Sequence, residues 1–263
     1  MPPGSARFWS WWFAARAARD PLLGVYALMA ECLALMEPGL ETGVAQGKLA
    51  WWREELARLC AGSPLHPITR YLAALPRAAA ADFALLDRAV EAVAVQVAGV
   101  PLECSAEFEP HAAALYGAPL LAAARLAGTR GDDGLDDCLR ALAAGEYLAR
   151  AIADYGRHAR GGRIVFAIDE LLAAGIANDD LTAGTATPHL RSYLEELRLR
   201  AAGYFAAAGT ALRAPARPAL RHLPVLAALG ARRLSERRRP EADFRPGDLY
   251  NAWTAARRAA RAR

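Results

Sequence analysis

Apolar residues recur at steps of three and four along most of this sequence, which is the spacing of a buried stripe on an α-helix. Residues 20–36 follow this pattern with few β-branched side chains, and VAQGKLAWWREELARLC (44–60) repeats it with charged residues on the opposite face. Further helices are expected at 63–75, 80–97, 109–126, 135–155, 188–212 and 218–234. No stretch shows the convincing alternation of a β-strand, so the pattern predicts an all-α, single-domain bundle of about ten helices.

The pattern divides the chain into three segments. Residues 1–19 contain SARFWSWWFAA and are expected to form a short amphipathic lead-in that packs on the rest of the protein. Residues 20–234 form the helical domain, and residues 235–263 are expected to be a basic C-terminal tail. Ser63 and Pro64 are residue types that cap and begin a helix, so a helix is predicted to start there.

Composition and charge narrow the classes of function. The chain has 263 residues, 54% of them hydrophobic, yet no window approaches the roughly 18 uninterrupted apolar residues of a membrane-spanning helix. The formal charge is +4, and the excess lies in RRLSERRR (232–239) and AARRAARAR (255–263). These runs favour either a solvated face or contact with an anionic membrane surface. Nucleic-acid binding is not expected, because no recognised motif accompanies the charge.

The cysteines bear on the cellular compartment. Cys32, Cys60, Cys104 and Cys138 are widely scattered, and none has the Cys/Cys or Cys/His spacing of a zinc site. Reduced thiols of this kind are typical of a cytoplasmic protein, and the N-terminus lacks the features of a signal peptide. The sequence therefore predicts a cytoplasmic protein, and the basic runs leave association with a membrane surface open.

Two stretches resemble a known family. KLAWWREEL (48–56), followed by HPITRYL (66–72), resembles the second-helix signature of the squalene/phytoene synthase superfamily, the head-to-head type of trans-isoprenyl diphosphate synthase. RHARGGRIVFAIDELLAAGI (157–176) resembles its DARRGRVYLPLDEL segment, and ALYGAPLLAAARLAG (114–128) is similar to the helix that lies between them. The resemblance covers the chain from about residue 20 to residue 204 and implies an all-helical bundle around a deep central cavity.

By this resemblance the family's first aspartate-rich motif falls on a segment without aspartates. Family members join two prenyl diphosphates, and two such motifs hold the Mg²⁺ that neutralises the diphosphate charge. The two leading aspartate positions here are Leu33 and Ala34, and the third is Glu37. Leucine and alanine do not coordinate a cation, so the resemblance implies that this half of the magnesium site is missing.

The second motif is altered in the same direction. Asp154 is retained, but the final Glu-Asp pair of the family pattern has become Arg157 and His158, and upstream Gln and Asn positions are Tyr147 and Arg150. Asp154 and His158 are four residues apart and therefore share one helical face. Replacing carboxylates with Arg and His reverses the local charge, which disfavours Mg²⁺ and favours direct contact with an anion.

GDDGLDDC (131–138) contains a DDxxD pattern made by Asp132, Asp133 and Asp136. In the family register this segment falls in a variable linker before the helix of the second motif. Aspartates flanked by glycine suit a helix start, where Asp132 or Asp133 caps the backbone and acids complement the helix dipole. We prefer this capping interpretation to metal binding.

The resemblance also suggests which residues form the site. For diphosphate binding we expect Arg157, Arg160 and Arg163, of which the last two match basic positions of the family. Side chains expected to line the cavity are Tyr26, Leu33, Trp51 and Tyr147. If the protein is active, Asp154 is the expected catalytic residue and Glu37 and Asp154 are the expected metal ligands.

Two functions remain in competition. The first is a non-catalytic relative, a pseudoenzyme resembling the complex I assembly-factor-like branch, that needs no cofactor and binds an isoprenoid diphosphate or another lipid-like ligand, or acts as a scaffold for a protein partner. The second is an active, Mg²⁺-dependent prenyl-diphosphate transferase of the squalene/phytoene type with a divergent metal site. A third role, limited to a membrane surface, rests on the basic C-terminal region.

Overall fold

The computed structural model describes residues 3–37, 39–78, 82–129, 134–183, 185–212, 218–237 and 245–261, and every regular element within these ranges is helical. The predicted all-α fold is therefore confirmed. The first elements are α1 (Ala6–Phe13), α2 (Arg16–Ala34), α3 (Thr42–Cys60), α4 (Pro67–Ala73) and α5 (Ala84–Val97). The middle of the chain forms η2 (Ser105–Glu107), α6 (Phe108–Ala112), η3 (Ala113–Gly117), α7 (Ala118–Leu126) and α8 (Leu135–Arg160). The last elements are α9 (Ile168–Ala173), α10 (Asn178–Thr182), α11 (Pro188–Ala211), α12 (His222–Ser235) and α13 (Pro246–Arg261).

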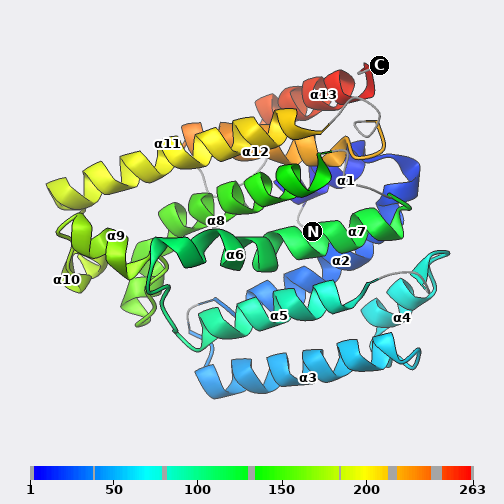
Figure 1. Ribbon diagram of the computed structural model, residues 1–263, viewed down its shortest axis with the longest axis horizontal. Helices are drawn as coiled ribbons and strands as arrows, with labels where there is room; N and C mark the ends of the chain where they lie inside the picture. The colour runs from blue at the N-terminus through cyan, green and yellow to red at the C-terminus, as the bar shows by residue number, and fades with distance from the viewer. Residues whose placement is uncertain are drawn as a thin grey trace.

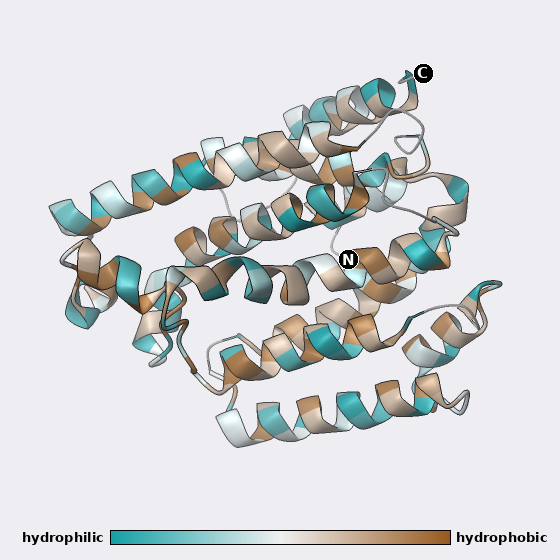
Figure 2. Ribbon diagram, viewed as in Figure 1, coloured by the Kyte–Doolittle hydropathy of each residue, from teal (hydrophilic) through white to brown (hydrophobic). Residues whose placement is uncertain are grey.

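Helix α8 lies at the centre of the bundle. It packs along α11 and also contacts α12, α6 and η3, so almost every side chain in its middle section is buried. Figure 1 shows the helices as successive rows, from α13 and α11 at one edge through α8, α6 and α7 to α5 and α3 at the other. The outermost helix, α3, mixes hydrophilic and hydrophobic positions (Figure 2), as expected of a helix with one face in solvent.

The N-terminal lead-in is a helix that packs on the body of the protein. Ser5 caps α1, because its hydroxyl accepts a hydrogen bond from the Phe8 amide at 3.1 Å. Ser10 and Tyr26 share a hydrogen bond of 2.9 Å that joins α1 to α2. Arg221 donates to the carbonyl of Phe13 at 2.6 Å, which ties the end of α1 to the start of α12.

Helix α4 begins later than the sequence suggests. His66 is its N-cap and Pro67 its first residue, whereas Ser63 and Pro64 precede it. The reason is Glu55 of α3, whose buried carboxylate accepts hydrogen bonds from the backbone amide of His66 at 2.8 Å and from that of Leu65. These bonds hold residues 65–66 outside the helix, so the prediction for Ser63 and Pro64 was wrong.

The segment expected as one helix from 109 to 126 is interrupted by a π-helical turn, η3. This turn replaces one α-helical turn and places Leu115 and Tyr116, two consecutive buried residues, along the central cavity. Turns of this kind occur frequently at functional sites. The spacing of apolar residues does not reveal a π-helical turn. The turn adds one residue, and this shifts the apolar pattern by less than the pattern varies along an ordinary helix.

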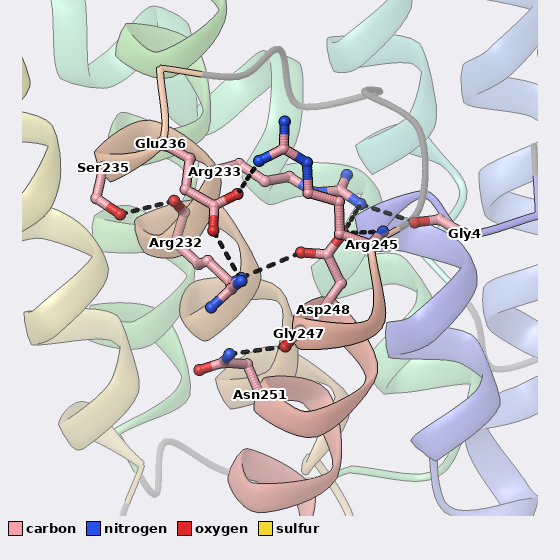
Figure 3. A network of polar contacts seen from close by, with 9 residues as sticks. All are labelled: Gly4, Arg232, Arg233, Ser235, Glu236, Arg245, Gly247, Asp248 and Asn251. Carbon is pink, nitrogen blue, oxygen red and sulfur yellow. Dashed lines mark hydrogen bonds and ion pairs between the residues drawn. The ribbon is translucent and has the colours of Figure 1, made fainter.

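The C-terminal region contains a packed helix where a basic tail was expected. Asp248 of α13 is fully buried and forms an ion pair of 3.4 Å with Arg233 of α12, which is only 1% exposed. Arg233 also donates to the carbonyl of Gly4 at 2.7 Å, so one buried arginine joins both ends of the described chain (Figure 3). Part of the basic run at 232–239 is therefore structural. No helix in the described ranges is both long and apolar enough to cross a membrane.

Candidate functional site

A cavity of about 480 Å³ lies between the end of α2, the turn η3 and the second half of α8. Its lining combines apolar residues with a set of charged and polar ones. The charged and polar residues are Arg7, Glu37, Gln96, Tyr116, Tyr147, Arg150, Asp154, Arg157 and His158. A narrower, mostly apolar pocket of about 80 Å³ adjoins it and shares Arg7, Tyr116 and Arg150 with it. The site is thus polar on one side and apolar on the other.

The apolar pocket lies between α1, α2, η3 and α12. It is lined by Tyr26, Met29, Leu120 and Leu226 among others. Burial raises the pKa of Tyr26 to about 12, so this phenol stays neutral and donates or accepts hydrogen bonds only as a hydroxyl. Most of its lining is apolar, and its charged residues are Arg7 and Arg150, which also line the larger cavity, and Glu146, which pairs with Arg150.

Tyr147 forms part of the cavity wall beside α5 and the segment after α8. Its hydroxyl donates to the carbonyl of Val165 at 2.9 Å and accepts from the amide of Gln96 at 3.3 Å. Gln96 also contacts His111 Nε2 at 3.0 Å. Burial raises the pKa of Tyr147 and lowers the pKa of His111, so both groups are neutral at pH 7. This wall offers neutral hydrogen-bonding groups to a ligand.

Arg157 connects the two segments that resemble the family's aspartate-rich motifs. Its guanidinium forms an ion pair with Glu37, beyond the end of α2, and another with Asp154 of α8 at 3.2 Å. The Asp154 side chain is 12% exposed and the Arg157 side chain 31%, so the group lies at the cavity rim, partly shielded from water. A cation built into the protein therefore stands between the two carboxylates that were predicted as metal ligands.

Two further arginines face the cavity and were not predicted to bind a ligand. Arg150 lies 3.6 Å from Glu146, one turn before it on α8, and over the ring of Tyr116 at 5.4 Å. Arg7 enters the cavity from the first turn of α1, with its guanidinium 5.9 Å from the Tyr26 ring. Arg150 could have been noticed from the sequence, because it stands where the family pattern has an amide side chain. Arg7 offered no such signal, because only the packing of α1 brings it to the cavity.

Of the three arginines predicted to bind diphosphate, the structure places one in the cavity. Arg157 lines it, whereas Arg160 is exposed at the end of α8. Arg163 lines a separate small pocket beside Gly99 and the start of α3. Burial lowers the pKa of His158, and the charges of Arg163 and Arg157 lower it further, so this cavity residue is neutral at pH 7.

Among the residues predicted to line the cavity, Tyr26, Leu33 and Tyr147 do so. Trp51 does not line either pocket, is 41% exposed and contacts the ring of His66 from the outer side of α3. The structure therefore disagrees with the expectation for Trp51. The physical reason is that its neighbour Trp52, 5% exposed, takes the inward position on α3.

Asp136, the described aspartate of the DDxxD pattern, lies far from this cavity. Asp132 and Asp133 fall outside the described residues, whereas Asp136 is in the first turn of α8, which Gly134 caps in a left-handed conformation. Asp136 precedes Asp154 by 18 residues of one continuous helix, a separation of roughly 27 Å. Residue Asp136 therefore cannot act together with the carboxylates of the cavity.

The described carboxylates fit a magnesium ion poorly. No group of three or more His, Cys, Asp or Glu side chains in the described ranges is arranged to hold a metal. Mg²⁺ needs near-octahedral oxygen ligation, usually with carboxylates free to face the ion. Here Glu37 and Asp154 are both occupied by the Arg157 guanidinium.

The described helices form a bundle with a polar-to-apolar cavity between its central helices. The sequence matches the squalene/phytoene synthase family over residues 3–258, and the chain therefore belongs to that family. The match includes α1 and most of α13, beyond the segment from residue 20 to residue 204 on which the motifs lie.

Solved structures agree with this assignment at the level of the fold. A dehydrosqualene synthase crystallised in complex with ligand superposes with a TM-score of 0.73 at 15% identity, over 97% of this chain and 90% of that one. The squalene synthase HpnC from Alicyclobacillus acidocaldarius superposes with a TM-score of 0.65 at 19% identity, over 95% and 88% of the two chains. No curated protein matches the sequence.

Proposed function

We propose that this member of the squalene/phytoene synthase family is a non-catalytic protein that binds an isoprenoid diphosphate or another lipid-like ligand without Mg²⁺. The observation that carries the proposal is the position of Arg157 between Glu37 and Asp154. A guanidinium supplies a fixed positive charge and several donors in one plane. It therefore offers hydrogen-bond donors to an anionic head group while occupying the carboxylates that Mg²⁺ requires.

The cavity supports a ligand with an anionic or polar head and an apolar chain. Arg7, Arg150 and Arg157 all reach the polar side, where guanidinium groups hold phosphate oxygens in bidentate fashion. The adjoining pocket between α2 and α12 is apolar and narrow. Arg160 and Arg163 lie outside both pockets, so we assign the head-group contact to Arg157 and its two neighbours instead.

Ionisation of an allylic diphosphate needs more than binding. The leaving diphosphate carries several negative charges, which hard cations stabilise most as the bond breaks. Arginine pairs that are already neutralised by Glu37, Asp154 and Glu146 contribute less to this step, because part of their charge is compensated before the reaction begins. Binding without turnover is the outcome that this charge balance favours.

The alternative is an active prenyl-diphosphate transferase. It retains some support because Glu37 and Asp154 lie within reach of one guanidinium and could hold a single Mg²⁺ if Arg157 moved away. Asp154 would then be the catalytic residue, with the same pair as metal ligands. The first proposal also includes a role as a scaffold for a protein partner. It further includes a cytoplasmic location near a membrane, because a protein close to a bilayer exchanges a lipid-like ligand with it most readily.

The test measures binding of farnesyl diphosphate by titration calorimetry, with Mg²⁺ or with EDTA, alongside release of inorganic pyrophosphate. We expect the same affinity in both buffers and no pyrophosphate. Arg157→Gln should weaken binding by roughly ten- to a hundredfold, as expected for loss of a charged hydrogen-bonding partner. Arg160→Gln is the matched control, because it removes an exposed arginine from the same helix three residues later.

Three results would contradict the proposal. Pyrophosphate release that depends on both Mg²⁺ and Asp154, tested with Asp154→Asn, would establish the transferase. Equal losses of affinity in Arg157→Gln and Arg160→Gln would show that the head group does not bind in the cavity. Absence of binding in both buffers would show that the pocket does not bind this class of ligand.

A further inference from the structure

The terminal helix α13 has its large apolar side chains on the outside. Its buried stripe consists of Asp248 and four alanines. The alanines are Ala252, Ala255, Ala256 and Ala259. On the opposite side Leu249 is 40% exposed, Tyr250 65% and Trp253 42%. A helix that merely completes a water-soluble bundle places its large apolar residues inward, so this distribution is reversed.

The same outward face is strongly basic in its second half. Arg257 and Arg261 are exposed and follow Trp253 at steps of four residues, and Arg258, also exposed, lies at the edge of this face beside a pocket that α11 and α12 share with α13. Arg257 lies over the Trp253 ring with its guanidinium carbon 4.5 Å from the centroid. The only acidic residue of α13, Asp248, is buried and paired with arginines of α12. The exposed surface of α13 therefore combines aromatic side chains with positive charge.

Helix α13 is held firmly enough to present this face. Asp248 accepts a hydrogen bond from the Arg245 amide at the helix start and pairs with Arg232 and Arg233 (Figure 3). Arg233 in turn binds the carbonyl of Gly4, three residues before Arg7 of the cavity. The face is thus fixed on a packed helix that is connected to one wall of the ligand pocket.

We infer that the outward face of α13 docks the protein on an anionic lipid surface. Tyr and Trp favour the interface between head groups and acyl chains, and Leu249 adds apolar area at the same level. Arginines beside them reach lipid phosphates while their stems cover apolar surface. The aromatic and basic residues alone would also suit single-stranded nucleic acid, but the exposed aliphatic Leu249 beside them favours a lipid surface. The inference does not depend on the proposed ligand.

The experiment is co-sedimentation of the full chain with vesicles of phosphatidylcholine alone or mixed with phosphatidylglycerol. We expect binding to the mixed vesicles only, weakened by added salt. A variant with Arg257→Gln, Arg258→Gln and Arg261→Gln should lose roughly a hundredfold in affinity, since each arginine near an anionic surface contributes several-fold. Tyr250→Ser with Trp253→Ser should reduce binding about tenfold through lost interfacial insertion.

The controls are an exposed tryptophan and an exposed arginine elsewhere. Trp51→Ser removes a side chain of similar exposure from α3, at the opposite edge of the molecule (Figure 1). Arg191→Gln removes one exposed arginine from the first turn of α11. Both should bind as the unchanged protein does, and circular dichroism melting checks that every variant is folded.

Several outcomes would overturn this inference. No sedimentation of the unchanged protein with mixed vesicles is one, and equal losses in the control variants are another. Tighter binding to a single-stranded oligonucleotide than to the mixed vesicles, abolished by the same arginine changes, would assign the face to nucleic acid. Because the vesicles contain no isoprenoid, failure here leaves the ligand proposal standing, and failure of the ligand proposal leaves this test intact.

Discussion

Glu55 shows how a single buried carboxylate organises the chain around it. Its side chain is fully buried and accepts hydrogen bonds from Thr69, from the backbone amides of Leu65 and His66, and from Arg58. Burial alone would raise the pKa of Glu55, but these donors outweigh it and lower the pKa to about 2. The ionised group therefore fixes the connection between α3 and α4.

This lowered pKa predicts a loss of stability in acid. Because the folded-state pKa lies below the unfolded value of 4.5, the contribution of Glu55 is fully present above about pH 4.5 and is lost as the pH falls towards 2. The full loss is about 3 kcal/mol, of which about 2 kcal/mol is expected by pH 3. Urea unfolding between pH 6 and pH 3 checks it, and Glu55→Gln should start less stable and lose less over this interval. Parallel curves for the two proteins would refute the prediction.

Residue positions that face inward were the hardest to predict. Trp51 and Trp52 are adjacent and equally apolar, yet only Trp52 is buried. Arg157 and Arg160 are three residues apart on α8, yet only Arg157 reaches the cavity. Sequence spacing shows which residues share a helix face. Which of these faces another helix covers is decided by the packing between helices. That is why three of the predicted positions, Trp51, Arg160 and Arg163, lie outside both pockets.

At the scale of elements, close approach between α8 and α11 depends on a glycine. A Cβ atom added at Gly145 of α8 would lie 2.9 Å from the ring of Phe205, which is 2% exposed. A contact this short forces the ring or the helices apart. Gly230 of α12 meets the same ring, so three helices converge on Phe205.

Gly145→Ala should therefore destabilise the protein by roughly 1–3 kcal/mol, although alanine is the better helix former. Gly203→Ala is the matched control, since no atom lies within 4 Å of its added Cβ and α11 is exposed there. This control should be stabilising by up to about 1 kcal/mol. The melting temperatures of the two variants are compared with that of the unchanged protein. A higher melting temperature for Gly145→Ala would contradict the prediction, because it would show that α8 and α11 can move apart without loss of stability.

Helix boundaries were predicted well where they depend on residues close in sequence. Most long helices were anticipated from apolar spacing within a few residues of α2, α3, α5, α8, α11 and α12. The turn η3, the late start of α4 and the helix α13 were not anticipated. The start of α4 depends on Glu55 and the packing of α13 on Arg233, and such distant partners leave no trace in the spacing of nearby residues.

At the scale of the molecule, the site is a meeting of segments far apart in sequence. Arg7, Glu37, Arg150 and Arg157 come from α1, the end of α2 and α8. Their charges largely balance, because Glu37 and Asp154 pair with Arg157 and Glu146 pairs with Arg150. Leu33 and Ala34, at the positions of the missing aspartates, also line this cavity.

Restoring these aspartates should make ligand binding respond to magnesium. In a Leu33→Asp, Ala34→Asp variant, two carboxylates would face the cavity and provide oxygen ligands that the protein now lacks there. We expect the affinity for farnesyl diphosphate to rise at least about tenfold when Mg²⁺ is added, which corresponds to about 1.4 kcal/mol. Titration calorimetry with and without EDTA measures this, and Leu33→Asn, Ala34→Asn is the uncharged control. If the affinity of the aspartate variant is the same with and without Mg²⁺, residues 33 and 34 do not lie near the head group.

The sequence by itself determined the all-helical fold, the family and the presence of Leu33 and Ala34 where the resemblance places aspartates, because apolar spacing and motif order are local properties that survive without coordinates. Only the tertiary structure decided that Arg157 stands between Glu37 and Asp154, that Arg7 and Arg150 face the same cavity, and that α13 turns its aromatic residues outward. The physical reason is that each depends on which helices pack together. Packing depends on the complementary shapes and charges of distant segments, which no single stretch of sequence contains.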